Sequence, residues 1–263
     1  KIHGGNLETI FHISSLSMVQ SLCLEKLIQS MAKQKLPKKT KKQKERAHEI
    51  MNELYTYYPN PECELDHRNP FELLIATILS AQCTDVRVNK VTPKLFELYP
   101  TPELMKDAPI EDLEELVRTT GFFRNKAKSL KETSTILAEE FDGKVPQNMD
   151  DLLKLRGAAR KTANVVLGNA FGINAGVVVD THVKRFSNRF GLTKHKSNTD
   201  KIERDLMALF PQENWTDLSH LMIHHGRGPC KARISSAPDH PLCEEYGINC
   251  ECQKMRAKEN KAK

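Results

Sequence analysis

Apolar residues recur at helical spacing along most of this chain, and alternating strand patterns are almost absent. The segment 70–82, PFELLIATILSAQ, is too apolar for a surface helix, and Asn69 before it is a typical N-cap. We therefore expect a central core helix there. Further helices are predicted at 42–58, 85–99, 101–106, 110–119, 124–141, 149–155, 160–171, 181–190, 199–210 and 216–225. The pattern predicts an all-α fold with short connections.

The charge of the chain is concentrated near one end. The net charge of the chain is +6. Residues 31–46 alone carry a net charge of +7, so the rest of the chain sums to −1. This lysine run is typical of a disordered arm, which either holds DNA loosely or only keeps the protein in solution. Residues 1–30 lack a basic n-region and a small-residue cleavage site, and no segment is long enough to span a membrane. We interpret them as upstream extension.

Candidate chemistry lies in 155–167, LRGAARKTANVVL, and 177–185, VVVDTHVKR. A glycine-containing hairpin that opens a helix can hold a phosphate on its backbone N–H groups. Lys161 supplies an amine that can form a Schiff base at a sugar C1′, and Asp180 supplies a charge that steadies a sugar cation. A neighbouring cation such as Arg160 would lower the pKa of Lys161. The alternatives are a solvated surface lysine and an aspartate that only caps a helix.

At these residues the chain resembles the endonuclease III family of helix-hairpin-helix DNA glycosylase/AP lyases. The stretches HRNPFELLIATILSAQCTDVRVNK, TTGFFRNKAK, VDTHV and HHGRGPCKAR stand in family order around the hairpin, across 42–252. The resemblance implies that Lys161 is the Schiff-base lysine and Asp180 the catalytic aspartate. It further implies that Gln82 fills the gap left by an extruded base and that Phe122 is the wedge beside it.

The family's architecture implies a two-domain fold in which a six-helix barrel is inserted into a second helical domain. In this chain the barrel with the hairpin would be 63–173, and the discontinuous domain 42–62 plus 174–252. Residues 1–41 would be a disordered or extraneous extension with the basic tail, and 253–263 a basic C-terminal tail. Lys161 and Asp180 would then face each other across the cleft between the two domains, where a flipped base enters.

The hairpin departs from the family's usual L-P-G-V-G-R-K. Gly157, Ala159 and Arg160 are the predicted DNA-binding residues, but Ala159 stands at the second glycine position and Arg156 at the proline. If that position requires positive φ or a close phosphate approach, Ala159 would cost on the order of 1 to 2 kcal/mol. Arg156 would offset part of this by contacting a phosphate. We therefore expect weaker DNA binding.

The cysteines depart further. The family commonly holds a [4Fe–4S] cluster on C-x6-C-x2-C-x5-C; anchored on Cys230, the other positions fall on Ala237, His240 and Tyr246. The cysteines present are Cys230, Cys243, Cys250 and Cys252, a C-x12-C-x6-C-x-C pattern. A retained cluster, a lost cluster and a zinc-like substitute all remain open.

For the pair at 224 and 225, HH, the favoured role is packing or capping at a helix end. Seven cysteines without an export signal favour a reducing compartment.

The expected function is base-excision repair by a bifunctional glycosylase that removes oxidised pyrimidines and nicks abasic DNA by β-elimination. Its partner would be double-stranded DNA with damaged pyrimidines or abasic sites, and the protein would act as a monomer. The expected location is cytoplasmic and nucleoid-associated if the source is prokaryotic. The alternatives are a monofunctional glycosylase for another base and a non-catalytic or weakly active helix-hairpin-helix DNA-binding protein.

Overall fold

The computed structural model describes residues 36–233, 240–248, 250, 253 and 255. Throughout these residues the regular elements are α- and 3-10 helices, without a strand, which confirms the all-α prediction. The described residues from Pro37 onward form one compact unit. The predicted N-terminal extension to residue 35 and most of the predicted C-terminal tail lie outside the described residues.

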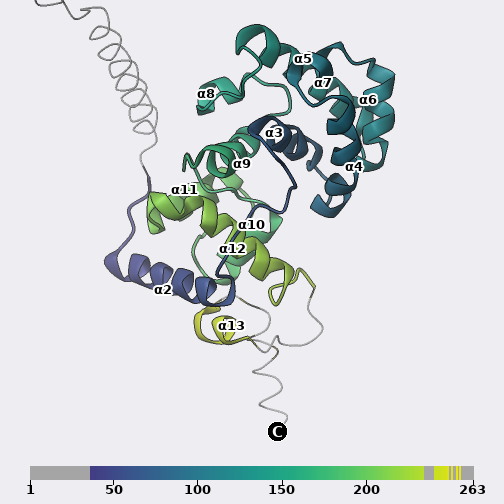
Figure 1. Ribbon diagram of the computed structural model, residues 1–263. Helices are drawn as coiled ribbons and strands as arrows, with labels where there is room; N and C mark the ends of the chain where they lie inside the picture. Colours follow the sequence, from purple (N-terminus) through teal and green to yellow (C-terminus); the bar gives the residue numbers. More distant parts are fainter. Residues whose placement is uncertain (1–35, 234–239, 249, 251–252, 254, 256–263) are drawn as a thin grey trace, which may run out of the picture. The chain divides into compact units, whose positions relative to one another are not determined.

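The helices follow the predicted order closely (Figure 1). They are α2 (Lys41–Tyr57), α3 (Pro70–Leu79), α4 (Asp85–Leu98), α5 (Pro102–Asp107), α6 (Ile110–Val117), η1 (Arg118–Thr120), α7 (Phe123–Glu140), α8 (Met149–Leu152), α9 (Arg160–Phe171), α10 (Thr181–Arg189), α11 (Thr199–Leu209), η2 (Gln212–Asn214), α12 (Trp215–Arg227) and α13 (Pro241–Tyr246). Helix α13, which begins at Pro241, was not predicted.

Helix α3 is the core helix that its composition predicts. Every residue from Phe71 to Leu79 is buried, and the Asn69 side chain accepts from the N–H of Glu72 at the start of the helix. The helix ends at Leu79 and not at the predicted residue 82. The Ser80 hydroxyl donates back to a carbonyl of the last turn, and the backbone is left-handed at Gln82, which a continuing α-helix does not allow.

Two groups of helices pack within the compact unit. Helix α3 packs on α4, α7 and α9, and α5 and α6 pack on α7, around one apolar cluster of residues between Leu65 and Leu167. Helix α12 packs on α10 and α2, and α11 and α13 also contact α2. Helix α9 contacts both α3 and α12, so the two groups meet along the helix that carries Lys161 (Figure 1).

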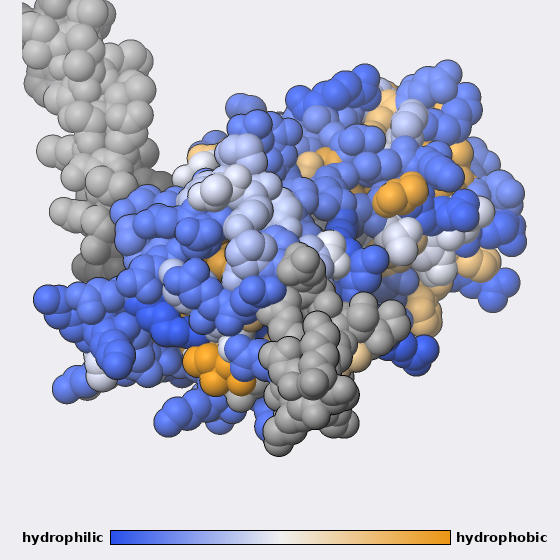
Figure 2. All heavy atoms as spheres, turned by 90° about the horizontal axis from the view of Figure 1, so that it is seen from below, coloured by the Kyte–Doolittle hydropathy of each residue, from blue (hydrophilic) through white to orange (hydrophobic). Residues whose placement is uncertain are grey.

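The face shown in Figure 2 is largely hydrophilic, with small separate apolar patches. In the described chain, Phe122 is 65 % exposed, against complete burial for most aliphatic side chains of the core. No described helix combines the length and the apolar character that crossing a bilayer requires.

Candidate active site and nucleic-acid interface

The turn between α8 and α9 has a glycine where its backbone requires one. Gly157 has φ +83°, and a Cβ built on it would lie 3.2 Å from Cγ2 of Ile78. Leu155 and Ala158 are buried on either side, and the N–H of Ala158 donates to the carbonyl of Leu155. Ala159 has φ −71° and ψ 170°, which any residue adopts without strain. The positive φ under which Ala159 would be penalised is therefore not present at this position, and the left-handed residue of the turn is Gly157.

The first turn of α9 offers unsatisfied donors. Ala159 is its N-cap but has no side chain that can accept, and no acceptor within the described chain pairs with the N–H groups of Arg160, Lys161 or Thr162. Such amides, at the positive end of a helix, favour an anion. The hairpin therefore supplies the backbone of a phosphate site despite the missing second glycine.

The two arginines of the hairpin are paired within the protein. The Arg160 guanidinium donates to both oxygens of the buried Glu203 carboxylate, at 2.9 to 3.2 Å, and this hydrogen bonding raises the pKa of Arg160. Arg156 pairs with Glu132 at 2.6 Å on the surface. A phosphate contact by either guanidinium therefore has to compete with a carboxylate already in place, and the contacts stay predictions.

Lys161 and Asp180 lie in the same electrostatic neighbourhood, although they come from different helices. Lys161 is exposed in the first turn of α9, and Asp180 is the N-cap of α10. The charges of both residues affect the pKa of the Asp85 carboxyl group, at the start of α4. Burial raises the pKa of Asp85; the lysine charge opposes that shift, and the Asp180 charge adds to it.

Asp180 caps its helix and still has a second oxygen available. Its Oδ1 accepts from the N–H groups of His182 and Val183, both at 2.8 Å. For Oδ2 the described residues provide no donor. Asp180 therefore caps α10, and this cap does not exclude chemistry at the other oxygen.

Gln82 and Phe122, the predicted base-replacing residues, share an unusual backbone. Both are exposed, and they have φ 54° and φ 49°. Among described residues other than glycine, only Asp142 also has positive φ. Left-handed backbone at a bulky residue is costly, so surrounding contacts have to impose it. The geometry presents an amide and an aromatic ring at the surface, as insertion into a base stack requires.

One buried ammonium group ties the two loops together. Lys126, in α7, is 5 % exposed, and its Nζ donates to the carbonyls of Leu79 and Thr120, each at 2.8 Å. Leu79 ends α3 just before the Gln82 loop, and Thr120 ends η1 just before Phe122. Burial lowers the pKa of Lys126. This positioning lysine was missed in the sequence, where a lysine in an amphipathic helix is typical of a surface.

Asp85, whose pKa the Lys161 charge affects, was also missed, as was its partner Arg227. Asp85 accepts a hydrogen bond from Arg227 of α12 at 2.5 Å, and Arg227 forms a second ion pair with Glu64. The contacts link the end of α12 to the start of α4. The only sequence signal was an aspartate in the first turn of a helix, which a favourable helix dipole explains equally well.

The predicted metal ligands do not come together as four thiolates. Cys230 is buried, with its Sγ 3.2 Å from Nη1 of Arg189, whereas Cys243 has its Sγ 3.2 Å from Nε2 of His225. Cys250 is disulfide-bonded, and Cys252 lies outside the described residues. Of the predicted ligands, the described residues therefore provide two thiols, Cys230 and Cys243, and not the four thiolates of a [4Fe–4S] cubane.

Cys243 can also be taken as the second ligand of the family's C-x6-C-x2-C-x5-C spacing. In that register only one of the last three ligand positions lacks a cysteine. Those positions fall on Cys243, Tyr246 and Cys252, so that a tyrosine stands where the third thiolate is required. The partly exposed Tyr246 is engaged through its backbone carbonyl, which accepts from Arg46 at 2.5 Å. Neither register therefore supplies the complete ligand set.

Comparison with known proteins gives a consistent result. Residues 75–212 match the family model described as HhH-GPD superfamily base excision DNA repair protein. Endonuclease III of Synechocystis is 52 % identical, over 84 % of this chain and 98 % of its own; that of Bacillus subtilis is 45 % identical, over 72 % and 87 %.

Solved structures agree. A trapped endonuclease III–DNA covalent intermediate matches with a TM-score of 0.75 at 43 % identity, over 80 % of this chain and 97 % of that one. A non-covalent endonuclease III–DNA complex matches with a TM-score of 0.76, also at 43 % identity, over 81 % and 98 %. A thermostable thymine-DNA glycosylase, at 22 % identity and a TM-score of 0.65 over 81 % and 95 %, shares the fold. The chain belongs to the endonuclease III family within the HhH-GPD superfamily of base excision DNA repair proteins.

Proposed function

We propose that this protein is a DNA glycosylase and AP lyase that removes oxidised pyrimidines from duplex DNA and nicks the abasic strand. The observation that carries the proposal is the exposed Lys161 amine beside the uncapped amides of α9. Its charge and that of Asp180 both affect the pKa of the Asp85 carboxyl group. The relatives named endonuclease III, and the solved covalent DNA intermediate of one, support the same reaction.

DNA would be bound first through its backbone. The α9 amides beside the Gly157 hairpin donate hydrogen bonds to a phosphate, and the damaged nucleotide leaves the stack to reach Lys161. Gln82 and Phe122 occupy the vacated space, because both project from left-handed backbone at the surface.

The chemistry then needs only an amine and a carboxylate. The neutral Lys161 amine bonds to C1′ while the C1′–N bond breaks, and the base leaves with the electron pair and takes up a proton. The Asp180 carboxylate stabilises the positive charge that develops on the sugar. The amine nitrogen then loses one proton, the C1′–O4′ bond breaks as O4′ takes up a proton, and a protonated Schiff base forms. Loss of a C2′ proton then breaks the C3′–O bond and releases the phosphate, and water hydrolyses the Schiff base.

Borohydride trapping on abasic duplex DNA tests this proposal. Wild type should give a covalent adduct and Lys161→Ala none. Lys154→Ala, which removes an exposed lysine of the same hairpin paired with Asp151, should trap like wild type. Asp180→Asn keeps a capping side chain, so it should fold normally yet release damaged bases at least about tenfold more slowly. An undiminished adduct with Lys161→Ala would exclude the assignment.

The same assay separates the alternatives. Base release without nicking by wild type would indicate a monofunctional glycosylase. Binding of abasic duplex with neither product, at high enzyme excess, would indicate a non-catalytic DNA-binding protein.

The organisation of the protein is part of the proposal. We infer a barrel lobe of 63–173 and a second lobe of 42–62 plus 174–252, supported by the separate apolar cluster between Leu65 and Leu167 and by the packing of α2 on α11, α12 and α13. We further propose that the protein acts as a monomer, because one chain carries every residue of the scheme. We also propose that it works at the chromosome, which in a prokaryote lies in the cytoplasm.

A further inference from the structure

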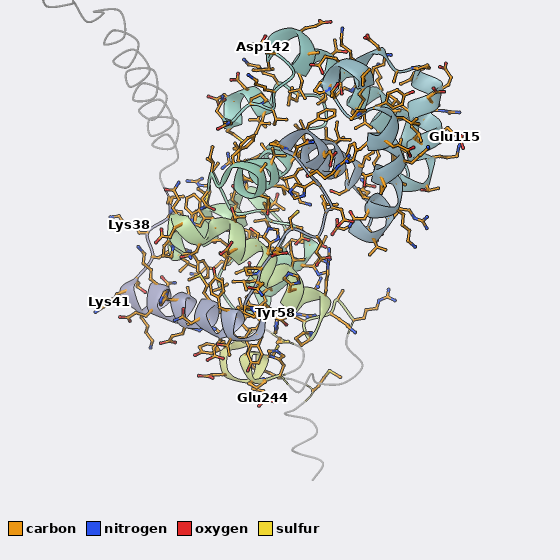
Figure 3. All side chains as sticks on the ribbon, in the orientation of Figure 1. Lys38, Lys41, Tyr58, Glu115, Asp142 and Glu244 are labelled. Atoms are coloured by element: carbon orange, nitrogen blue, oxygen red, sulfur yellow. The ribbon has the colours of Figure 1, made fainter. Side chains whose placement is uncertain are left out.

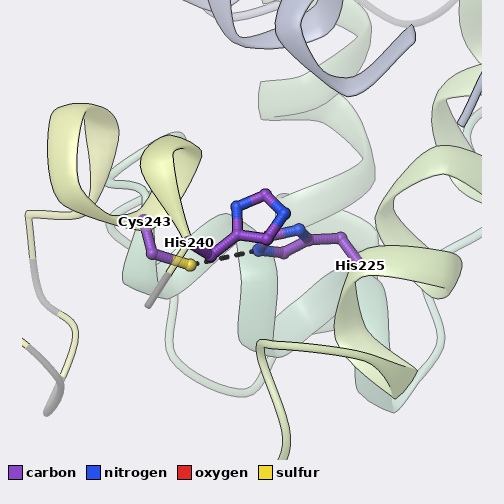
Figure 4. Close-up of side chains that lie close together, drawn as sticks. All are labelled: His225, His240 and Cys243. Atoms are coloured by element: carbon purple, nitrogen blue, oxygen red, sulfur yellow. Dashed lines mark hydrogen bonds between the residues drawn. The ribbon is translucent and has the colours of Figure 1, made fainter. Parts of the chain in front are cut away.

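Three side chains with metal-binding atoms converge where α12 and α13 approach each other (Figure 4). His225 lies near the end of α12, His240 is the N-cap of α13, and Cys243 is in α13. Their ligand atoms all lie within 4.8 Å of one another. His225 and Cys243 are buried at 0 % and 1 % exposure, and His240 is partly buried.

The His240 ring has a buried nitrogen that nothing in the described chain satisfies. Its Nδ1 is inaccessible to solvent and has no hydrogen-bond partner. A buried nitrogen of this kind costs about 1 to 3 kcal/mol, and native structures usually satisfy it with a group, a water molecule or an ion. A cation shared with Cys243 and His225 would give this nitrogen a partner.

The His225 ring is already oriented as a ligand. Its Nδ1 lies 3.5 Å from the hydroxyl of Tyr58, which is at the end of α2 (Figure 3). Its Nε2 faces Cys243 (Figure 4). The rings of Phe186 and Phe190 contact it edge-on, with centroids 5.3 and 5.7 Å away. A polar partner on the second nitrogen and tight packing around the ring are what fix an imidazole for metal binding.

The separations suit one small tetrahedral cation. Zn–S and Zn–N bonds of normal length put the sulfur and nitrogen atoms about 3.5 Å apart across a tetrahedral ion. The His225 Nε2 to Cys243 Sγ distance is 3.2 Å, and the widest ligand pair is 4.8 Å, so the set closes with side-chain shifts of about 1 Å. A thiolate with two imidazoles is a donor set that favours zinc.

We propose that His225, His240 and Cys243 bind a single zinc ion, which fixes the α12–α13 segment in place of the four-thiolate cluster that the described residues do not fit. The predicted packing or capping role of the histidine pair explains His225 alone. It does not explain why His240 and Cys243, from a later part of the chain, converge on His225. The proposal adds a structural metal site and no catalytic step.

The full chain, purified without added metal, tests this proposal by elemental analysis and by cobalt substitution. We expect about one zinc per chain and, after removal of zinc with a chelator, a Co²⁺ complex with a thiolate charge-transfer band. Cys243→Ser should abolish that band. His240→Asn should weaken Co²⁺ binding at least about tenfold, the loss that second-shell changes alone can cause.

Controls and folding checks keep the result decisive. Cys63→Ser, which removes a half-buried thiol outside the set, should bind Co²⁺ as wild type does. If Cys243→Ser does not fold, judged by helical circular dichroism, His240→Asn at its partly exposed position decides. Stoichiometric iron with acid-labile sulfide in the purified protein would overturn the proposal. So would an unchanged Co²⁺ affinity of His240→Asn or an absence of zinc and of Co²⁺ binding. These measurements read metal content and not repair activity.

Discussion

Replacing Lys126 with methionine should uncouple the two loops that carry Gln82 and Phe122. The substitution keeps the length and apolar stem of the side chain but removes two hydrogen bonds of 2.8 Å to the carbonyls that end α3 and η1. A hydrogen bond to a charged group contributes about 1.5 to 3 kcal/mol, and an orphaned carbonyl costs about 1 to 3 kcal/mol. Burial lowers the pKa of Lys126, which shows that burying its ammonium group has a cost. The substitution removes that cost, and this offsets part of the lost stability. We expect the free energy of unfolding to fall by about 2 to 4 kcal/mol.

Lys128→Met is the matched control. Lys128 lies in the same helix two residues later, is 59 % exposed, and pairs with Glu132 at 3.8 Å, so its loss should cost less than about 1 kcal/mol. Urea unfolding of both variants gives the stabilities, and fluorescence anisotropy gives their affinities for abasic duplex DNA. Lys126→Met should also bind that DNA about tenfold less tightly, because the left-handed loops lose their common anchor. Equal stabilities and affinities for the two variants would refute the reasoning.

Three other predictions follow from single contacts. Gly157→Ala should lose about 1 to 2 kcal/mol of stability in urea unfolding, because φ is +83°, whereas Ala159→Gly at φ −71° should change stability by less than about 1 kcal/mol. Glu203→Ala should cost about 2 to 3 kcal/mol by the same method, since it orphans a half-buried guanidinium, against less than about 1 kcal/mol for the exposed Glu115→Ala. Burial lowers the pKa of His220 to about 4, so stability should be lost as pH falls from 6.5 towards 4; His220→Gln should reduce that slope by up to about 1.4 kcal/mol per pH unit, measured by unfolding at several pH values.

The sequence predicted the elements whose signals are local. The apolar run of α3, its Asn69 cap and the starts of α4 and α9 are each specified within a few residues, and the structure reproduces them. Gln82 and Phe122 were found through resemblance and not through their backbone, because a left-handed conformation at a residue other than glycine has no sequence signature. Their exposure is the structural feature that supports the proposed role.

Contacts between distant segments were not predictable in this way. Lys126 appears in the sequence as an ordinary helical lysine, and only folding brings it to carbonyls 47 and 6 residues away. His240 fell on a cluster position by counting, but its partner His225 comes from another helix. Spacing rules assume that neighbouring ligands share one loop, and they fail when an imidazole from α12 joins the set.

The alanine in the hairpin changes the DNA interface through its methyl group and not through backbone strain. At φ −71° and ψ 170° Ala159 costs no conformational energy, and the α9 amides that follow remain unpaired in the described structure. Its exposed Cβ stands beside those amides, so a bound phosphate has to approach past a methyl group that glycine would lack. Any loss of affinity must then grow with side-chain volume at this position and leave stability nearly unchanged. An effect on affinity without one on folding is what separates a contact with DNA from a distorted turn.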